Sequence, residues 1–349
     1  MLPMRKNCIL FLCLCISVQT TVAQVLGGKN VFSFLDLPVS PQISALGGVN
    51  VSSQQHDIAL SALNPALLRE TMHQHLQVNY TGYFSDVKYA HCLFGYHLDR
   101  LNTTLAGSVQ YIDYGSVTQT DAAGNIQGTF RPRDMAWQLT ASRRYLERWH
   151  YGISLQFIQS AYQQYKANGL AVHFGLTYQD TSRHWQAGLV ARNMGAQFRT
   201  YTAGNQEPLP FDLQVGVSKK LNKIPLELSA TLHHIYQFDI RYADPDFQEG
   251  GIITDGDTLA IGNTTDKIFR HFVLAAQWEI GKYVQLTASY NHLRRQELGL
   301  SQQKGLSGFS GGVGVITRKL QIRYARSWYQ RSEALNQLGL NVPLKEWSF

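Results

Sequence analysis

The chain has 349 residues, of which 44% are hydrophobic and 16% are charged, and its formal net charge is +7. The basic residues are scattered, without the aromatic-interleaved basic stripe of a nucleic-acid-binding surface, so no nucleic-acid partner is expected. A single unit of this length is ordinary for a barrel, whereas soluble folds of this length usually divide into two or three domains.

Residues 1–23 have the features of a secretory signal peptide: two basic residues, an apolar run, and a small residue, Ala23, at the expected cleavage site. Three of the four cysteines lie in this leader, so the expected mature chain keeps only Cys92. A framework of internal disulfides is therefore excluded.

Beyond about residue 75 the hydrophobicity repeats every two residues. In KYVQLTASYNH, residues 282–292, Leu286 lies on the apolar face of the predicted strand and Thr287 lies on the polar face. The same alternation occurs at 76–84 and 319–328. It is typical of strands with one apolar face and one wet face, which occur in soluble sandwiches and in membrane barrels.

Strand length separates these two architectures. Segments such as 102–117, 148–165 and 224–240 exceed the roughly 5–6 residues of a typical sandwich strand. They are long enough for the tilted strands of a membrane barrel, which need about 9–11 residues. The expected fold class is all-β, a 14-stranded antiparallel outer-membrane β-barrel over residues 75–349.

Short and long connections alternate along the predicted barrel. The predicted strands are 75–84, 87–98, 102–117, 130–146, 148–165, 168–180, 183–195, 210–221, 224–240, 268–280, 283–297, 305–317, 319–330 and 334–344. The longer connections between them include 118–129, 196–209, 241–267 and 298–304. This alternation predicts a bacterial cell outer-membrane protein with short periplasmic turns and longer extracellular loops.

Residues 24–74 do not alternate, and they contain a predicted short helix at 57–63. Their stretch SALGGVNVSSQQHDIALSALNPALL resembles the N-terminal signature of the FadL-like outer-membrane family. The matching residues are Gly47, Gly48, Asp57, Asn64, Pro65 and Ala66. The resemblance implies that residues 24–74 form a hatch, or plug, inside the barrel lumen.

The opening VLGGKNVFSFLDLPVSPQISALGG is similar to the Bacteroidetes branch of that family, which contains PorV and PorQ of the type IX secretion system. This resemblance implies a role in the attachment complex, where cargo is processed and joined to anionic lipopolysaccharide. The implied partners are a PorZ-like surface protein, PorU/PorV-like components, and outer-membrane lipid or lipopolysaccharide. The wider family implies an alternative, a transporter of hydrophobic small molecules, but the polar inward faces favour a scaffold.

The motifs of catalysis do not appear in the sequence. It has no nucleophile elbow, phosphate-binding glycine loop or zinc-protease pattern, so neither enzyme activity nor a cofactor is expected. No metal site is expected either, because His233 and His234 are neighbours in a predicted strand and should face opposite sides.

The connection 241–267 is the longest predicted outer loop, and it is rich in acidic residues. We interpret it as a partner-docking loop, because long loops on a rigid scaffold commonly carry recognition. A solvated acidic loop and a calcium-binding loop are the alternatives. The candidate docking residues are Asp244, Asp246, Phe247, Glu249, Asp255 and Asp257.

Overall fold

The computed structural model describes residues 30–53, 55, 57–84, 86–240, 264–298, 305–329 and 334–347. The barrel strands are β1 (His75–Gly82), β2 (Lys88–Leu98), β3 (Thr103–Asp113), β6 (Arg133–Tyr145), β7 (Trp149–Tyr162), β8 (Tyr165–Asp180), β9 (Trp185–Arg199), β10 (Asp212–Lys220), β11 (Leu226–Leu232), β12 (Phe272–Ile280), β13 (Val284–Asn291), β14 (Phe309–Ile316), β15 (Gln321–Trp328) and β16 (Ala334–Pro343). No helix in the described ranges is long and apolar enough to cross a membrane.

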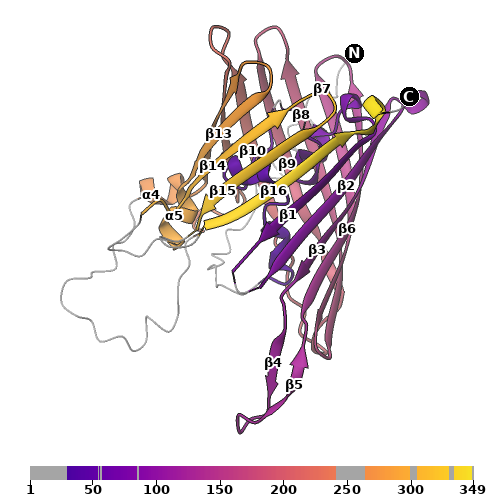
Figure 1. Cartoon of the computed structure of the whole chain (residues 1–349), viewed down its shortest axis with the longest axis vertical. Coiled ribbons are helices and arrows are strands. Elements are labelled where there is room, and N and C mark those ends of the chain that lie inside the picture. The colour runs from indigo at the N-terminus through magenta and orange to yellow at the C-terminus, as the bar shows by residue number, and fades with distance from the viewer. Residues whose placement is uncertain are drawn as a thin grey trace, which may run out of the picture.

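These strands form a closed antiparallel barrel, in which β1 pairs with β16 on one side and with β2 on the other. The predicted 14-stranded barrel is therefore confirmed (Figure 1). The connections at one end, such as Asp99–Leu101 between β2 and β3, are short, as predicted. We call this the turn end, and the opposite end, which carries the longer connections, the loop end.

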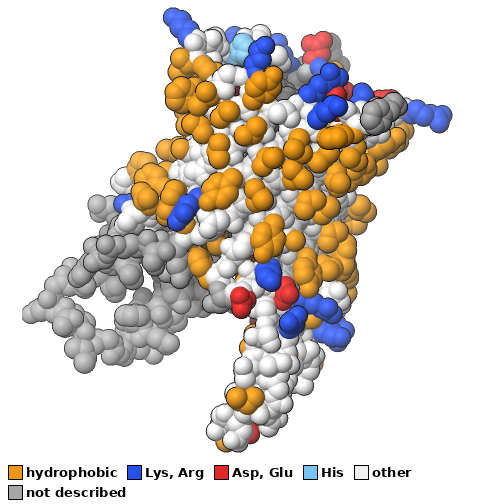
Figure 2. All heavy atoms as spheres, in the orientation of Figure 1, with side chains coloured by type: hydrophobic (Ala, Val, Ile, Leu, Met, Phe, Trp, Pro, Cys, Tyr) orange, Lys and Arg blue, Asp and Glu red, His pale blue; other side chains and the backbone are white. Residues whose placement is uncertain are grey.

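Polar side chains line the interior and apolar ones cover the exterior. In β13, Gln285 and Thr287 are buried inside the barrel, whereas Leu286 on the outer face is 39% exposed. Leu286 lies beside Trp278 of β12 and Val313 of β14, which are also exposed. Apolar side chains cover the outer wall in this way between the two ends (Figure 2). An apolar outer wall around a polar interior is the surface of a membrane-spanning barrel of the outer-membrane type.

The predicted loop 118–129 has regular structure of its own. The strands β4 (Val117–Thr120) and β5 (Ile126–Phe130) pair with each other outside the barrel sheet. Their hairpin projects from the loop end well beyond the barrel wall (Figure 1). Asp121 closes its turn by accepting hydrogen bonds from the backbone N–H groups of Ala123 and Asn125.

Two predicted strands end well before their expected last residue. The strand predicted at 224–240 ends at Leu232, because His234 adopts a left-handed conformation with φ of 54°. The strand predicted at 283–297 ends at Asn291 and continues as helix α5 (His292–Leu298). The Asn291 side chain accepts a hydrogen bond from the Arg294 N–H, which starts that helix.

Candidate functional site

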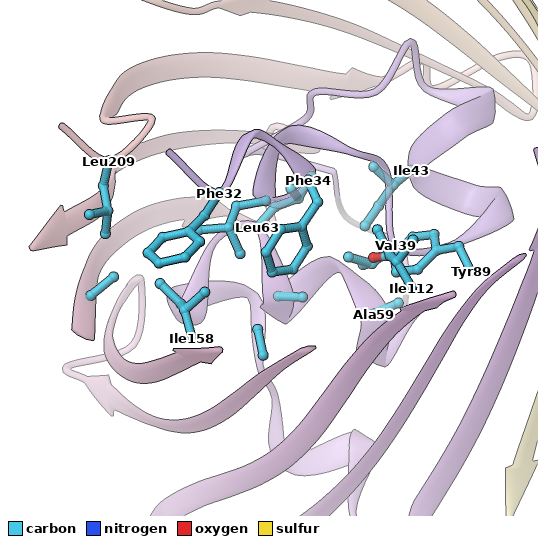
Figure 3. Close-up of a cluster of buried hydrophobic side chains, with 14 of the residues drawn as sticks. Phe32, Phe34, Val39, Ile43, Ala59, Leu63, Tyr89, Ile112, Ile158 and Leu209 are labelled. Carbon is cyan, nitrogen blue, oxygen red and sulfur yellow. The ribbon is translucent and has the colours of Figure 1, made fainter. Parts of the chain in front are cut away.

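The described part of residues 30–74 lies inside the barrel, where its apolar side chains form the core (Figure 3). Phe32 and Leu63 belong to the same buried cluster as Tyr89 of β2 and Ile158 of β7. Because a lumen of this width is too large for the wall's own side chains to fill, this N-terminal segment supplies the packing. It begins beside Tyr162 and Tyr201 at the loop end and reaches Arg144 and Glu147 at the turn end.

Gly47 and Gly48 end the short helix α2 (Pro41–Ala45) with φ angles of 90° and 89°, which favour glycine. The Gly48 N–H donates to the Ile43 carbonyl at 2.9 Å, as in a helix C-cap. The Gly47 carbonyl accepts from the side-chain amide of Asn291 in β13 at 3.1 Å. The glycine pair therefore turns the segment where it is bound to the wall.

Asp57 is fully buried and holds the next turn. One of its oxygens accepts from the Ala59 N–H at 2.9 Å, at the start of the 3₁₀ turn η2 (Ile58–Ala62). The other oxygen lies 3.3 Å from the guanidinium of Arg323 in β15, which is also buried. The predicted helix at 57–63 is thus a 3₁₀ turn, tied to the wall by an ion pair.

Asn64 is fully buried, and both ends of its side-chain amide are bound. Its oxygen accepts from the Ala66 N–H at 3.0 Å, and its nitrogen donates to the Val51 carbonyl at 2.9 Å. Pro65 begins the following 3₁₀ turn, η3 (Pro65–Leu67). The Ala66 carbonyl accepts from Thr177 in β8. The predicted motif residues therefore cap the turns of the segment and bind it to the wall.

Glycines in the wall let the N-terminal segment approach the strands, a feature that was not predicted from the sequence. A Cβ added at Gly175 in β8 would lie 2.0 Å from the Asn64 side-chain oxygen. One added at Gly188 in β9 would lie 2.0 Å from the Val51 carbonyl oxygen. Inward glycines in long strands were the available signal, since glycine in a strand often marks close backbone approach.

The N-terminal segment has a cavity at each end. The turn-end cavity, about 440 Å³, is lined by polar and charged side chains that include Glu70 and Arg144. Arg69 also lines it, and donates to the Ala66 carbonyl at 2.6 Å and to Thr177 at 3.2 Å. Burial, with a smaller contribution from Arg144, lowers the pKa of Arg69 to about 10, so the guanidinium stays charged at neutral pH.

The loop-end cavity, about 410 Å³, lies between the start of the segment and the barrel rim. Phe32, Tyr165 and Tyr201 contribute rings to its lining, and Asp134 is its buried polar base. Tyr114 donates to Asp134 at 2.6 Å from the neighbouring wall. This cavity is aromatic at its sides and acidic at its base.

The candidate docking residues, Asp244, Asp246, Phe247, Glu249, Asp255 and Asp257, lie outside the described residues. Around the loop end, the described chain exposes other apolar side chains. Ile126 on the β4–β5 hairpin is 75% exposed, and Phe238 is 60% exposed. The hairpin is the described element that reaches farthest from the wall at this end (Figure 1).

His233 and His234 converge, although the alternation of a strand predicts that they face opposite sides. Their Nδ1 atoms lie 2.6 Å apart. The left-handed conformation of His234 breaks the alternation of the strand, so both rings turn toward Asp212 at the start of β10. A periodicity argument from sequence cannot detect such a residue, because it assumes an extended backbone.

No protein-family model matches the chain, and no curated protein matches it. Among solved structures, it is similar to a deltaS2 mutant of the monoaromatic hydrocarbon channel TodX, with 14% identity, a TM-score of 0.46, and coverage of 88% of this chain and 98% of that chain. KdgM porin has 6% identity and a TM-score of 0.33, over 79% and 99%. The Salmonella typhi outer membrane phospholipase has 10% identity and a TM-score of 0.28, over 77% and 88%.

Proposed function

We propose that this protein is a closed outer-membrane scaffold that anchors a surface protein at its loop end and performs no catalysis itself. The observation that carries the proposal is the β4–β5 hairpin, a paired element that projects from a barrel whose lumen holds the N-terminal segment. A rigid barrel that presents ordered loops is suited to recognition, because the scaffold fixes the position of the loops. In this proposal the loop end faces the outside of the cell.

The attachment of the N-terminal segment to the wall supports a static role. Separate hydrogen bonds join Asn50 to Ser229, Ser52 to Ser218, and Ala66 to Thr177. The buried Asp57–Arg323 pair adds an ionic contact. Opening a transmembrane path would break these contacts together, and each buried polar group left without its partner costs about 1–3 kcal/mol.

The sequence resemblance suggests the secretion system to which the proposed scaffold belongs. We infer a PorQ-type barrel of the type IX secretion attachment complex, with a PorZ-like surface protein as the anchored partner. PorU/PorV-like components and lipopolysaccharide would be its neighbours. The residues that support this inference are those of the stretch VLGGKNVFSFLDLPVSPQISALGG, residues 25–48, together with the motif Asn64-Pro65-Ala66.

The test is affinity capture of the tagged barrel from native outer membranes, with mass spectrometry of the proteins recovered. The unmodified barrel should recover a soluble surface protein and other secretion components. Ile126→Ser, on the projecting hairpin, should reduce recovery of the surface protein. Leu146→Ser is the matched control, because Leu146 is 71% exposed but lies at the turn end. Equal recovery with both variants would exclude Ile126 as an anchor, and recovery of no surface protein by the unmodified barrel would overturn the scaffold proposal.

A second candidate function is transport of hydrophobic small molecules, which the loop-end cavity favours. Phe32 and the surrounding tyrosines form an aromatic site large enough for a small ligand. Native mass spectrometry of the captured barrel would distinguish the two functions. A bound lipid or fatty acid that is lost in Phe32→Ala, with no surface protein recovered, would favour transport.

A further inference from the structure

Asp212, His233 and His234 form a convergent group at the loop end of the barrel. Their ligand atoms lie within 4.8 Å of one another. The two histidine Nδ1 atoms are 2.6 Å apart, and the Nδ1 of His234 is 3.7 Å from the Oδ2 of Asp212. Ligand atoms about 2.1 Å from one tetrahedral ion lie roughly 3.4 Å apart, so the 3.7 Å pair fits directly, and the two Nδ1 atoms, which lie at hydrogen-bond distance, would separate by roughly 0.8 Å when an ion replaces the proton between them.

The backbone holds this group in place. Asp212 begins β10, and its Oδ1 accepts from the His234 N–H at 2.6 Å. The His233 N–H donates to the carbonyl of His271 at 3.1 Å, next to β12. His234 has φ of 54°, which turns its ring toward that of His233. Residues at the ends of three adjacent strands therefore hold the three ligand residues together before any ion binds.

Hydrogen bonds do not satisfy every polar atom of this group. Asp212 and His233 are buried, and the Nε2 of His233 has no hydrogen-bond partner within the described ranges. When one of the two facing Nδ1 atoms donates to the other, the donor ring has its proton on Nδ1 and the acceptor ring has its proton on Nε2. Gln214 donates to the Oδ2 of Asp212 at 2.6 Å, which orients the carboxylate as outer-shell partners do in metal sites.

The group is open to solvent on one side. The side chain of His234 is 34% exposed, which leaves a path from solvent to the group.

We propose that Asp212, His233 and His234 bind one transition-metal ion of the zinc class at the loop end. Two imidazole nitrogens and one carboxylate oxygen suit zinc and its neighbours, whereas calcium and magnesium prefer oxygen ligands alone. Three protein ligands leave one tetrahedral position open to water or to a partner's side chain. The ion would join the start of β10 to the chain that leaves β11.

The experiment is equilibrium dialysis of the purified full-length barrel in detergent against Zn²⁺ alone, after treatment with a chelator, with the bound metal measured by mass spectrometry. One ion per barrel is expected. His234→Asn should weaken binding by at least about tenfold, because a ligand is lost and outer-shell changes alone cost about 10–100-fold. Asparagine tolerates the left-handed backbone, so this variant keeps the local fold.

His150→Ala is the matched control, because it removes a histidine at the turn end, far from the group. It should bind zinc as the unmodified barrel does. Cobalt substitution supplies a second measurement, in which a tetrahedral visible absorption band should appear in the unmodified barrel and disappear in Asp212→Asn. Absence of bound zinc at micromolar concentration would overturn the proposal, as would unchanged binding by His234→Asn.

Discussion

Asn64 stabilises the N-terminal segment from both sides of its bend. Its side chain caps the turn at Ala66 and also binds the Val51 carbonyl, thirteen positions earlier in the chain. Because Asn64 is completely buried, water cannot replace either bond when the side chain is removed. This one amide therefore joins the two sides of the bend.

We predict that Asn64→Ala lowers the free energy of unfolding by about 2–4 kcal/mol, from the loss of a helix cap and of a buried hydrogen bond. Urea unfolding in lipid vesicles measures this change. Asn125→Ala is the control, because Asn125 is exposed on the hairpin and should change the stability little. Equal losses in the two variants would contradict the role assigned to Asn64.

The ion pair between Asp57 and Arg323 is a second contact that a single substitution can test. Removing one charge from a buried pair costs about 3–5 kcal/mol, because the other charge stays buried without a partner. We therefore expect Asp57→Asn, which keeps an oxygen to cap Ala59, to lower the free energy of unfolding by that amount. Lys220→Gln, in the half-exposed pair with Glu279, should cost only about 0–1 kcal/mol. Urea unfolding of both variants gives the comparison, and a small loss for Asp57→Asn would show that water reaches the pair.

At the scale of the elements, the contact between the N-terminal segment and the wall depends on missing side chains. Gly152 of β7 lies beside Gly175 of β8, and Gly188 of β9 lies beside Gly216 of β10. The four positions together form a strip without side chains, against which Val51 and the Asn64–Ala66 turn pack. Larger residues in this strip would displace the segment rather than the wall, whose strands are fixed by their hydrogen bonds.

We predict that Gly188→Ala displaces the segment, because the new Cβ would lie 2.0 Å from the Val51 carbonyl oxygen. Overpacking of this kind lowers the free energy of unfolding by about 1–3 kcal/mol. Because the displaced segment would open space in the lumen, the variant should conduct more ions across planar bilayers. Gly314→Ala is the matched control in the same lumen, because its Cβ would make an ordinary 3.4 Å contact with Arg323. Conductance that stays at the unmodified level in Gly188→Ala would show that the segment adapts without opening a path.

The elements differ in how well sequence predicts them. The strand around Leu286 was predictable, because its alternation and the tight turn at Gly281 are local signals. The end of β11 was not, since the left-handed His234 depends on a hydrogen bond to Asp212 in another strand. The end of β13 was missed for a different reason, because the cap that Asn291 gives helix α5 is local but is not part of the strand alternation. The β4–β5 hairpin was missed because its short strands alternate too weakly to be distinguished from a loop.

At the scale of the molecule, the fold class followed from periodicity, whereas the contacts of the N-terminal segment required the structure. Resemblance identified Asn64 and Asp57, but no local pattern links Asp57 to Arg323 or Val51 to Gly188. The residues of each pair are distant in sequence. Which residues meet depends on the register of strands around the whole barrel, whereas a short turn fixes the register of only its own two strands. The convergence of Asp212 with His233 was hidden for the same reason.

The apolar outer wall explains why so many large hydrophobic side chains are exposed in a stable fold. Leu286 lies in that wall with 39% of its surface exposed, whereas Ile126 lies on the hairpin beyond the barrel with 75% exposed. If both side chains were in water, replacing the more exposed Ile126 with a polar residue would cost less stability than replacing Leu286. In a bilayer, depth decides the cost instead, because lipid cannot solvate a charge near its midplane.

We therefore predict that Leu286→Arg destabilises the barrel by about 2–4 kcal/mol in lipid vesicles, as charges near the bilayer midplane do. Ile126→Arg, which adds the same charge to a similar apolar side chain, should leave the stability nearly unchanged, because the hairpin is in water. Urea unfolding of both variants in the same vesicles measures the difference. Equal stabilities would mean that Leu286 does not face lipid, and would contradict the membrane-spanning assignment of the wall around β13.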